Sequence, residues 1–250
     1  MEIPSVDTRW RGLYRIGGAA ALVAAILFRR NFGAEIALLR MTGILHLGYT
    51  TQPGTIVEWF ALLGSHRLIG LIMLNLFDLI NYGLVGLIFL ALCAALRRGR
   101  ESVVTIAAAL GFAGIVTYFA SNQAFTMLSL SRHYATATTD AQRSLLLSSG
   151  QAVLAVSHGN AYEGEGLSIS FLLVTVAGLM ISAAMLRSRV FAPGTAVIGI
   201  LANASGLAYY PALVAVPGVV ALPISISSVF LLIWYIQIGL RLLRLGRMTG

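Results

Sequence analysis

The apolar run from Leu68 to Leu96 constrains the fold more than any other stretch of this sequence. It reads LIGLIMLNLFDLINYGLVGLIFLALCAAL, and Asp78 is the one acidic or basic side chain within it. A helix of about 20 apolar residues crosses the hydrocarbon core of a bilayer. A carboxyl group at the middle of a membrane is costly and marks a candidate functional site. The run therefore predicts a transmembrane helix organised around Asp78.

The composition excludes a soluble globular protein. Hydrophobic residues make up 58% of the 250 residues and charged residues only 10%, whereas soluble domains carry about 25% charged residues. The net charge is +8, and every basic residue is an arginine. These arginines stand at the ends of apolar runs, which indicates a membrane protein and not a nucleic-acid-binding protein. The single cysteine, Cys93, excludes an intramolecular disulfide and a cysteine-based metal site.

The remaining apolar runs predict an all-α integral membrane bundle that forms one polytopic domain over residues 1–250. Two long connections between spans are expected to carry interfacial or outer-side helical segments, one within 33–65 and one within 131–165. Thr139, followed three residues later by Gln142, predicts a capping box in the second connection. Six spans are expected, at about 12–28, 68–96, 103–130, 167–186, 193–214 and 219–243.

The arginines also predict the orientation. With six spans, the two termini and the loops after the second and fourth spans lie on one side, which should be cytoplasmic. Arg29, Arg30 and Arg40 fall on the opposite side, but the bias still favours both termini in the cytoplasm. The arginines on the side of the termini are Arg9, Arg11, Arg15, Arg97, Arg98, Arg100, Arg187, Arg189, Arg241, Arg244 and Arg247.

Polar residues of the predicted spans suggest one buried pocket. Asn75, Asp78 and Tyr82 are spaced by three and four residues and so share one helix face. Asn122 and Asn203 are expected to converge on the same pocket from other spans. No arginine lies near the depth of Asp78, so we expect its carboxyl group to be neutral or hydrogen-bonded to amides and phenols. Two interpretations remain open: a ligand- or proton-binding site, and a polar clasp between helices.

The four histidines form a second candidate site. His46, His66, His133 and His158 fall in or beside the two outer connections, together with several glutamates. Histidines with carboxylates can hold a metal, and two histidines can hold a haem. However, no two histidines are four residues apart, and neither HExxH nor CxxCH is present. Histidines that contact solvent at the interface are therefore the preferred interpretation, and the sequence identifies no cofactor.

Residues 164–246 resemble bacterial six-helix membrane proteins that belong to families of unknown function. The resemblance is carried by GLSISFLLVTVAGLMISAAMLRSRVF, GILANASGLAYY and LIWYIQIGLRLLRLG. It implies six spans in a prokaryotic cytoplasmic membrane, and it implies no activity or site residue.

Three functions remain compatible with the sequence. The first is a small-solute or proton-coupled carrier, or a ligand-binding membrane protein, that uses the Asp78 pocket. The second is a structural or accessory subunit of a larger membrane complex. The third is an outward-facing metal- or haem-binding protein. No catalytic motif supports an enzyme, and the expected partners are the lipid bilayer and other membrane subunits, without nucleic acid.

Overall fold

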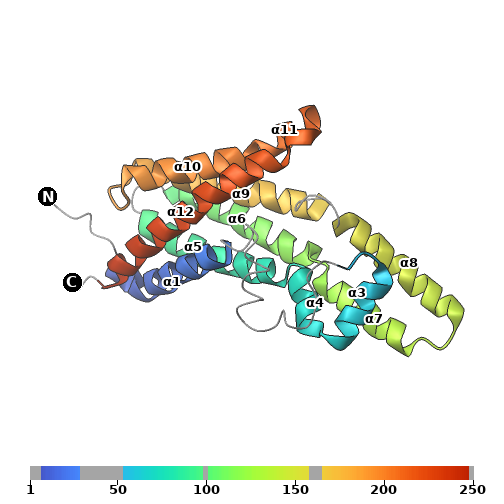
Figure 1. The fold of residues 1–250 in the computed structure, drawn as a ribbon. Coiled ribbons are helices and arrows are strands. Elements are labelled where there is room, and N and C mark those ends of the chain that lie inside the picture. The colour runs from blue at the N-terminus through green and yellow to red at the C-terminus, as the bar shows by residue number, and fades with distance from the viewer. Residues whose placement is uncertain (1–6, 29–52, 98–100, 158–164, 248–250) are drawn as a thin grey trace. The chain divides into compact units, whose positions relative to one another are not determined.

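The computed structural model describes residues 7–28, 53–97, 101–157 and 165–247. Within these ranges the regular elements are all helices, as Figure 1 shows. They are η1 (Thr8–Trp10), α1 (Arg11–Phe28), α3 (Ile56–Ser65), α4 (Arg67–Met73), α5 (Leu76–Leu96), α6 (Glu101–Ser121), α7 (Ala124–Thr136), α8 (Asp140–Ser157), α9 (Glu165–Leu186), α10 (Pro193–Leu207), α11 (Tyr209–Ala215), η4 (Pro217–Val219) and α12 (Ala221–Arg247).

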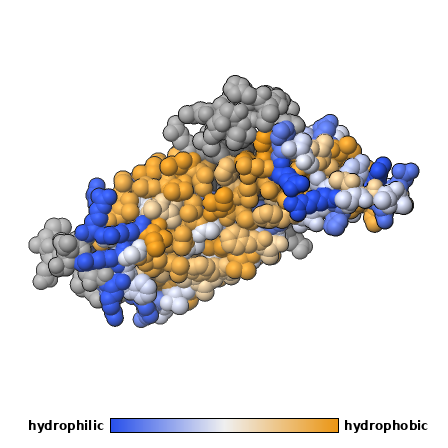
Figure 2. Space-filling view, turned by 90° about the horizontal axis from the view of Figure 1, so that it is seen from below, coloured by the Kyte–Doolittle hydropathy of each residue, from blue (hydrophilic) through white to orange (hydrophobic). Residues whose placement is uncertain are grey.

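Among the described residues, five helical stretches are long and apolar enough to cross a membrane. Large apolar side chains such as Ile106 and Val116 are exposed on them, at 53% and 64% of their surface, and Figure 2 shows a broad hydrophobic surface. So much exposed apolar surface is unfavourable in water and favourable in lipid. The chain is a multi-pass membrane protein. Its candidate spans are Leu76–Leu96, Glu101–Thr136, Gly166–Leu186, Pro193–Ala215 and Ala221–Arg247.

Several predicted spans differ from the helices of the structure. The predicted first span, 12–28, is present as α1 but is not among the five candidate spans. The predicted span 68–96 is two helices, α4 and α5, and the predicted span 103–130 is divided between α6 and α7. Residues 56–65 and 140–157 form the helices α3 and α8. An interfacial or outer-side position of these helices stays a prediction. The amphipathic segment expected near residues 33–48 lies outside the described residues.

The chain divides into two compact units, which we describe separately. Unit 1 comprises residues 1–31, 81–117 and 169–250, and unit 2 comprises residues 32–80 and 118–168. Helices α5, α6 and α9 contribute residues to both units.

In unit 1, α1 and α12 pack side by side in antiparallel directions (Figure 1). Near the start of α1, the Nε atom of Arg15 donates a hydrogen bond to the carbonyl oxygen of Gly246, at 2.9 Å. Farther along α1, a Cβ atom added to Gly18 would lie 2.8 Å from Cγ of Leu243, and one added to Gly239 would lie 3.0 Å from the side chain of Leu22. The beginning of α1 and the end of α12 therefore lie at the same end of unit 1.

Glycines also bring α6 close to α9, and α1 close to α5, in unit 1. A Cβ atom on Gly114 of α6 would lie 2.9 Å from the carbonyl oxygen of Ser170 in α9. The Ser170 hydroxyl in turn donates a hydrogen bond to the Gly114 carbonyl oxygen, at 2.7 Å. Gly17 of α1 meets Ala91 of α5 in the same way. Small residues at such positions let helix backbones approach, which is how helices associate in lipid.

Unit 2 packs short helices around large side chains. Trp59 of α3 is 1% exposed and Met127 of α7 is fully buried, and both belong to one apolar cluster. Thr55 and Glu58 form a capping box at the start of α3. At the start of α8, the Gln142 backbone N–H donates to Oγ1 of Thr139, at 3.2 Å. This confirms the side-chain cap that the sequence predicts there, although the Gln142 side chain reaches back to the N–H of Thr138 and not to that of Thr139.

Candidate functional site

The break between α4 and α5 occurs at Asn75, one of the predicted site residues. Asn75 has a φ of 66°, which is the only positive φ of a described residue other than glycine. Asparagine tolerates this left-handed conformation better than most residues and can end a helix in it. The N–H of Leu74 closes α4 on the Gly70 carbonyl oxygen, and the N–H groups of Asp78 and Leu79 then bond to the Asn75 carbonyl oxygen. Asn75 is thus the residue that separates α4 from α5.

Because of this break, Asp78 lies at a different place in its helix from the one that the sequence predicts. Asp78 lies in the first turn of α5 and is half-buried, whereas the sequence places it in the middle of one long span. Because α5 has 21 residues, it is about 30 Å long and crosses a hydrocarbon core by itself. Asp78 therefore lies at one end of a candidate span, where an acidic side chain is stabilised by the positive end of the helix dipole.

Tyr82 and Asn122 have local packing roles. Tyr82 lies one turn after Asp78 on α5 and packs, partly buried, against the apolar core of unit 1. Asn122 stands between α6 and α7, and its Oδ1 atom accepts a hydrogen bond from the Ala124 N–H, at 3.1 Å. Asn122 thereby satisfies a free N–H group at the start of α7. A pocket shared by Asn75, Asp78 and Asn122 with residues of unit 1 stays a prediction.

Asn203 is buried within unit 1, where α9 and α10 meet. Its Nδ2 atom donates to the Gly199 carbonyl oxygen of its own helix, at 2.7 Å. Its amide group also covers Gly178 of α9, because a Cβ atom added there would lie 2.8 Å from Cγ of Asn203. Gly178 of α9 and Asn203 of α10 therefore face each other. The Asn203 amide fills the space above a glycine.

A neighbouring contact adds α12 to this packed region. A Cβ atom added to Gly199 would collide with the Ser182 hydroxyl and would lie 2.8 Å from Cε2 of Trp234. Ser182 is fully buried, and its hydroxyl donates to the Gly178 carbonyl oxygen, at 2.8 Å. Polar side chains from three helices thus occupy the space that a pocket would need.

The structure describes two of the four histidines. His66 lies between α3 and α4, and His133 is exposed on α7, whereas His46 and His158 lie outside the described residues. Within the described ranges, no three histidine, cysteine or acidic side chains are grouped closely enough to hold a metal ion.

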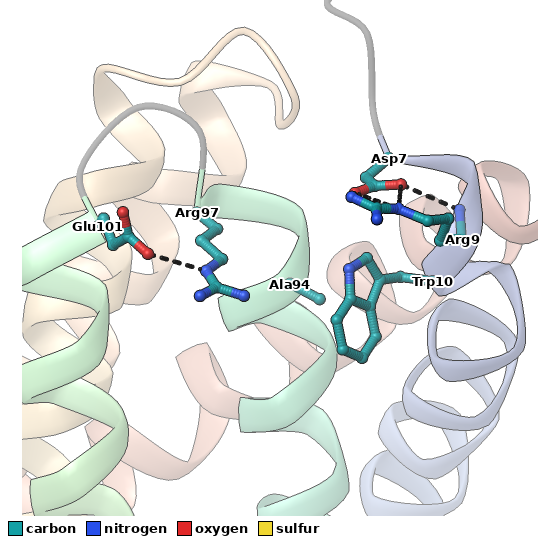
Figure 3. A pocket seen from close by; sticks show the side chains of 6 residues that line it. All are labelled: Asp7, Arg9, Trp10, Ala94, Arg97 and Glu101. Atoms are coloured by element: carbon teal, nitrogen blue, oxygen red, sulfur yellow. Dashed lines mark hydrogen bonds and ion pairs between the residues drawn. The ribbon is translucent and has the colours of Figure 1, made fainter.

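Arginines gather at the end of unit 1 where α1 begins and α12 ends, and two surface pockets open among them. Figure 3 shows the first pocket, of about 560 Å³, between η1 and the junction of α5 with α6. Its charges are paired: Arg9 lies 2.9 Å from Asp7, and Arg97 lies 3.0 Å from Glu101. Hydrogen bonds to Asp7, followed by the charge of Asp7, raise the pKa of Arg9.

The second pocket, which we call the arginine groove, has a volume of about 820 Å³ and lies between the end of α9, the start of α10 and the last turns of α12. Its charged lining consists of Arg187, Arg189, Arg241 and Arg244, and none of the described residues that line it is acidic. The Nε atom of Arg241 donates to the Val190 carbonyl oxygen, at 2.6 Å, and this bond holds the guanidinium against the groove wall.

Searches of protein-family models, curated proteins and solved structures find no match to the chain.

The sequence analysis did not identify Trp234 or the arginine groove as parts of a site. A spacing of seven residues puts Ser227, Trp234 and Arg241 on one face of α12, and this pattern was the available signal. The break at Asn75 was hidden because apolar residues surround it on both sides and no glycine or proline marks it.

Proposed function

We propose that the chain is a six-span protein of the bacterial cytoplasmic membrane with both termini in the cytoplasm, and that it acts as a structural or accessory subunit of a membrane assembly. The antiparallel contact between α1 and α12 supports α1 as the additional span. The arginines at that end support a cytoplasmic location for it. The resemblance of residues 164–246 to bacterial six-helix proteins agrees with this assignment.

One observation carries the subunit role: the candidate ligand-binding residue Asn203 is used for packing. Its amide group bonds within α10 and covers Gly178, while Ser182 and Trp234 close the space beside Gly199. A carrier needs a polar cavity that a solute can enter, near the middle of the membrane. Packed helices joined by short polar contacts are instead typical of a stable membrane scaffold.

Photo-crosslinking in intact membranes tests the subunit role without detergent. A photoreactive amino acid would replace exposed apolar residues on different helices, for example Val116, Leu201 and Val229. We expect protein adducts with one defined partner at positions on one side of the bundle and lipid adducts elsewhere. Lipid adducts at every position, together with a monomeric protein in mild detergent, would contradict the proposal.

Cysteine labelling tests the orientation separately. In a Cys93→Ser background, Ser102→Cys and Gly218→Cys variants would be treated with a membrane-impermeant thiol reagent. Ser102 lies in the first turn of α6, and Gly218 lies between α11 and α12, so the two positions should lie on opposite sides. We expect labelling of the Gly218→Cys variant in intact spheroplasts and of the Ser102→Cys variant only after lysis.

A second candidate, a carrier, is favoured by one feature, the broken helix at Asn75. Transporters place binding sites at such interruptions, where helix ends face the substrate. If Asp78 takes part in proton-coupled transport, Asp78→Asn should remove pH-dependent uptake in proteoliposomes. Asp140→Asn is the matched control, because Asp140 also lies in a first helical turn, that of α8. Equal pH dependence in both variants would exclude Asp78 as the coupling group.

A further inference from the structure

The arginine groove differs from the first arginine pocket in its balance of charge. In the first pocket, Asp7 and Glu101 neutralise Arg9 and Arg97 through ion pairs. In the groove, four arginines converge, and no carboxylate lines it within the part of the chain that the structure describes. Like charges repel each other when they are held close together. Bringing these four together is therefore favourable when an anion binds between them.

The start of α10 adds a second feature that favours an anion. Ala192 and Pro193, which begin this helix of 15 residues, line the groove. No side chain caps the helix there. Pro193 has no N–H group, and the Thr195 N–H bonds to the Ala192 carbonyl oxygen, at 3.0 Å. The start of α10 therefore contributes the positive end of its helix dipole, which attracts negatively charged oxygen atoms. Thus backbone and side chains present positive charge to the same space.

The position of the groove indicates where that anion comes from. The candidate span in α9 ends at Leu186, and the next begins at Pro193, so the groove stands where two apolar helices end. Helix α12 has 27 residues and is about 40 Å long. It therefore extends beyond a hydrocarbon core of about 30 Å, and its last turns with Arg241 and Arg244 reach the depth of lipid headgroups.

The groove also has an apolar wall. Leu186 and Leu240 line it and remain 44% and 46% exposed. A free phosphate ion would gain nothing from such side chains, whereas the acyl chains of a lipid would cover them. We propose that the arginine groove binds an anionic phospholipid, with the phosphodiester held by the arginines beside the start of α10 and the acyl chains against Leu186 and Leu240. Basic pockets between membrane helices bind acidic lipids through the same chemistry.

Native mass spectrometry of the full-length protein tests this proposal. Delipidated protein in mild detergent would be titrated with phosphatidylglycerol and, separately, with phosphatidylcholine, which has the same phosphodiester but no net charge. We expect phosphatidylglycerol to bind at least about tenfold more tightly than phosphatidylcholine. Each basic residue near an anionic headgroup adds an electrostatic attraction, and the attraction of several arginines together is large enough for a change in affinity of this size. Equal binding of the two lipids by the wild-type protein would overturn the proposal, and this comparison needs no variant.

A pair of charge variants locates the binding. Arg189→Gln/Arg244→Gln removes two exposed arginines of the groove. Arg9→Gln/Arg247→Gln removes the same charge from the same end of unit 1, at positions that do not line the groove. We expect the first double variant to lose at least tenfold in affinity for phosphatidylglycerol and the second to lose less than about twofold. Equal losses would show attraction to general surface charge only and would contradict a specific groove.

Inorganic phosphate distinguishes a lipid from a soluble anion. Its effect on the thermal unfolding temperature of the delipidated wild-type protein would be compared with the effect of phosphatidylglycerol. We expect a concentration-dependent rise with the lipid and no rise with phosphate. A similar rise with phosphate, lost in Arg189→Gln/Arg244→Gln, would show that the groove binds a soluble phosphate and would overturn the lipid assignment.

Discussion

Units 1 and 2 are both helical, but their helices are held together in different ways. In unit 1, glycines and small polar residues bring backbones together, as at Gly114 with Ser170 and at Gly178 with Asn203. In unit 2, large side chains around Trp59 form the core, and side-chain caps begin α3 and α8. In lipid, apolar side chains gain little by leaving their surroundings, so close packing decides. Burial of large apolar groups stabilises a structure chiefly where the alternative is water.

Polar residues have different structural roles in the two units. In unit 1, Asn203 and Ser182 complete the contact between helices. In unit 2, Asn75 and Asn122 stand where helices begin and end. A residue type that suggests one shared pocket in the sequence thus serves at least two local purposes.

The largest effect should come from removing the centre of the unit 2 core. Trp59→Ala should lower the stability of this unit by about 3–5 kcal/mol, because it removes a large buried side chain and leaves a cavity. Hydrogen exchange should show faster exchange in α3 and α7, which contribute to the cluster. Trp10→Ala, at a tryptophan that is 41% exposed, is the control and should change exchange little. Unchanged protection in the Trp59→Ala variant would mean that this cluster does not hold unit 2 together.

A smaller effect is expected from adding one methyl group in unit 1. Gly114→Ala would force α6 away from the Ser170 carbonyl and should cost about 1–2 kcal/mol after the gain in helix propensity. Gly12→Ala is the matched control, since a Cβ atom there meets nothing within 4 Å, and it should be neutral or slightly stabilising. Unfolding by SDS in mixed micelles would measure both. Equal stability of the two variants would remove the argument for close backbone contact.

The fold could be predicted in outline because hydropathy and charge act over whole helices. The apolar runs gave the helical class and most of the candidate spans, and the arginines indicated which helix ends belong together. The break between α4 and α5 could not be predicted, because it depends on the conformation of one asparagine, Asn75, within an otherwise apolar stretch. The site was harder still: the partners of Asn203 are glycines of α9 and α10, and such a contact is decided by how two helices cross.

The smallest expected effect concerns the cap of α3. Thr55→Ala should cost about 1 kcal/mol, because the Glu58 N–H loses its bond to Oγ1 of Thr55. Ser129→Ala, an exposed position in α7, should have almost no effect. Thermal unfolding of the two variants should differ by a few degrees. Identical unfolding temperatures would show that unit 2 does not depend on its caps.

Asn203 fills a packed contact between helices, whereas Asp78 lies half-buried at the end of a candidate span. The most direct measurement compares the reaction of Asn203→Cys and Asp78→Cys variants with a small water-soluble methanethiosulfonate, in membranes and in a Cys93→Ser background. We predict rapid reaction of the Asp78→Cys variant and no reaction of the Asn203→Cys variant until the protein is denatured. Comparable rates in native membranes would reveal a water-filled pocket at Asn203 and would contradict the account.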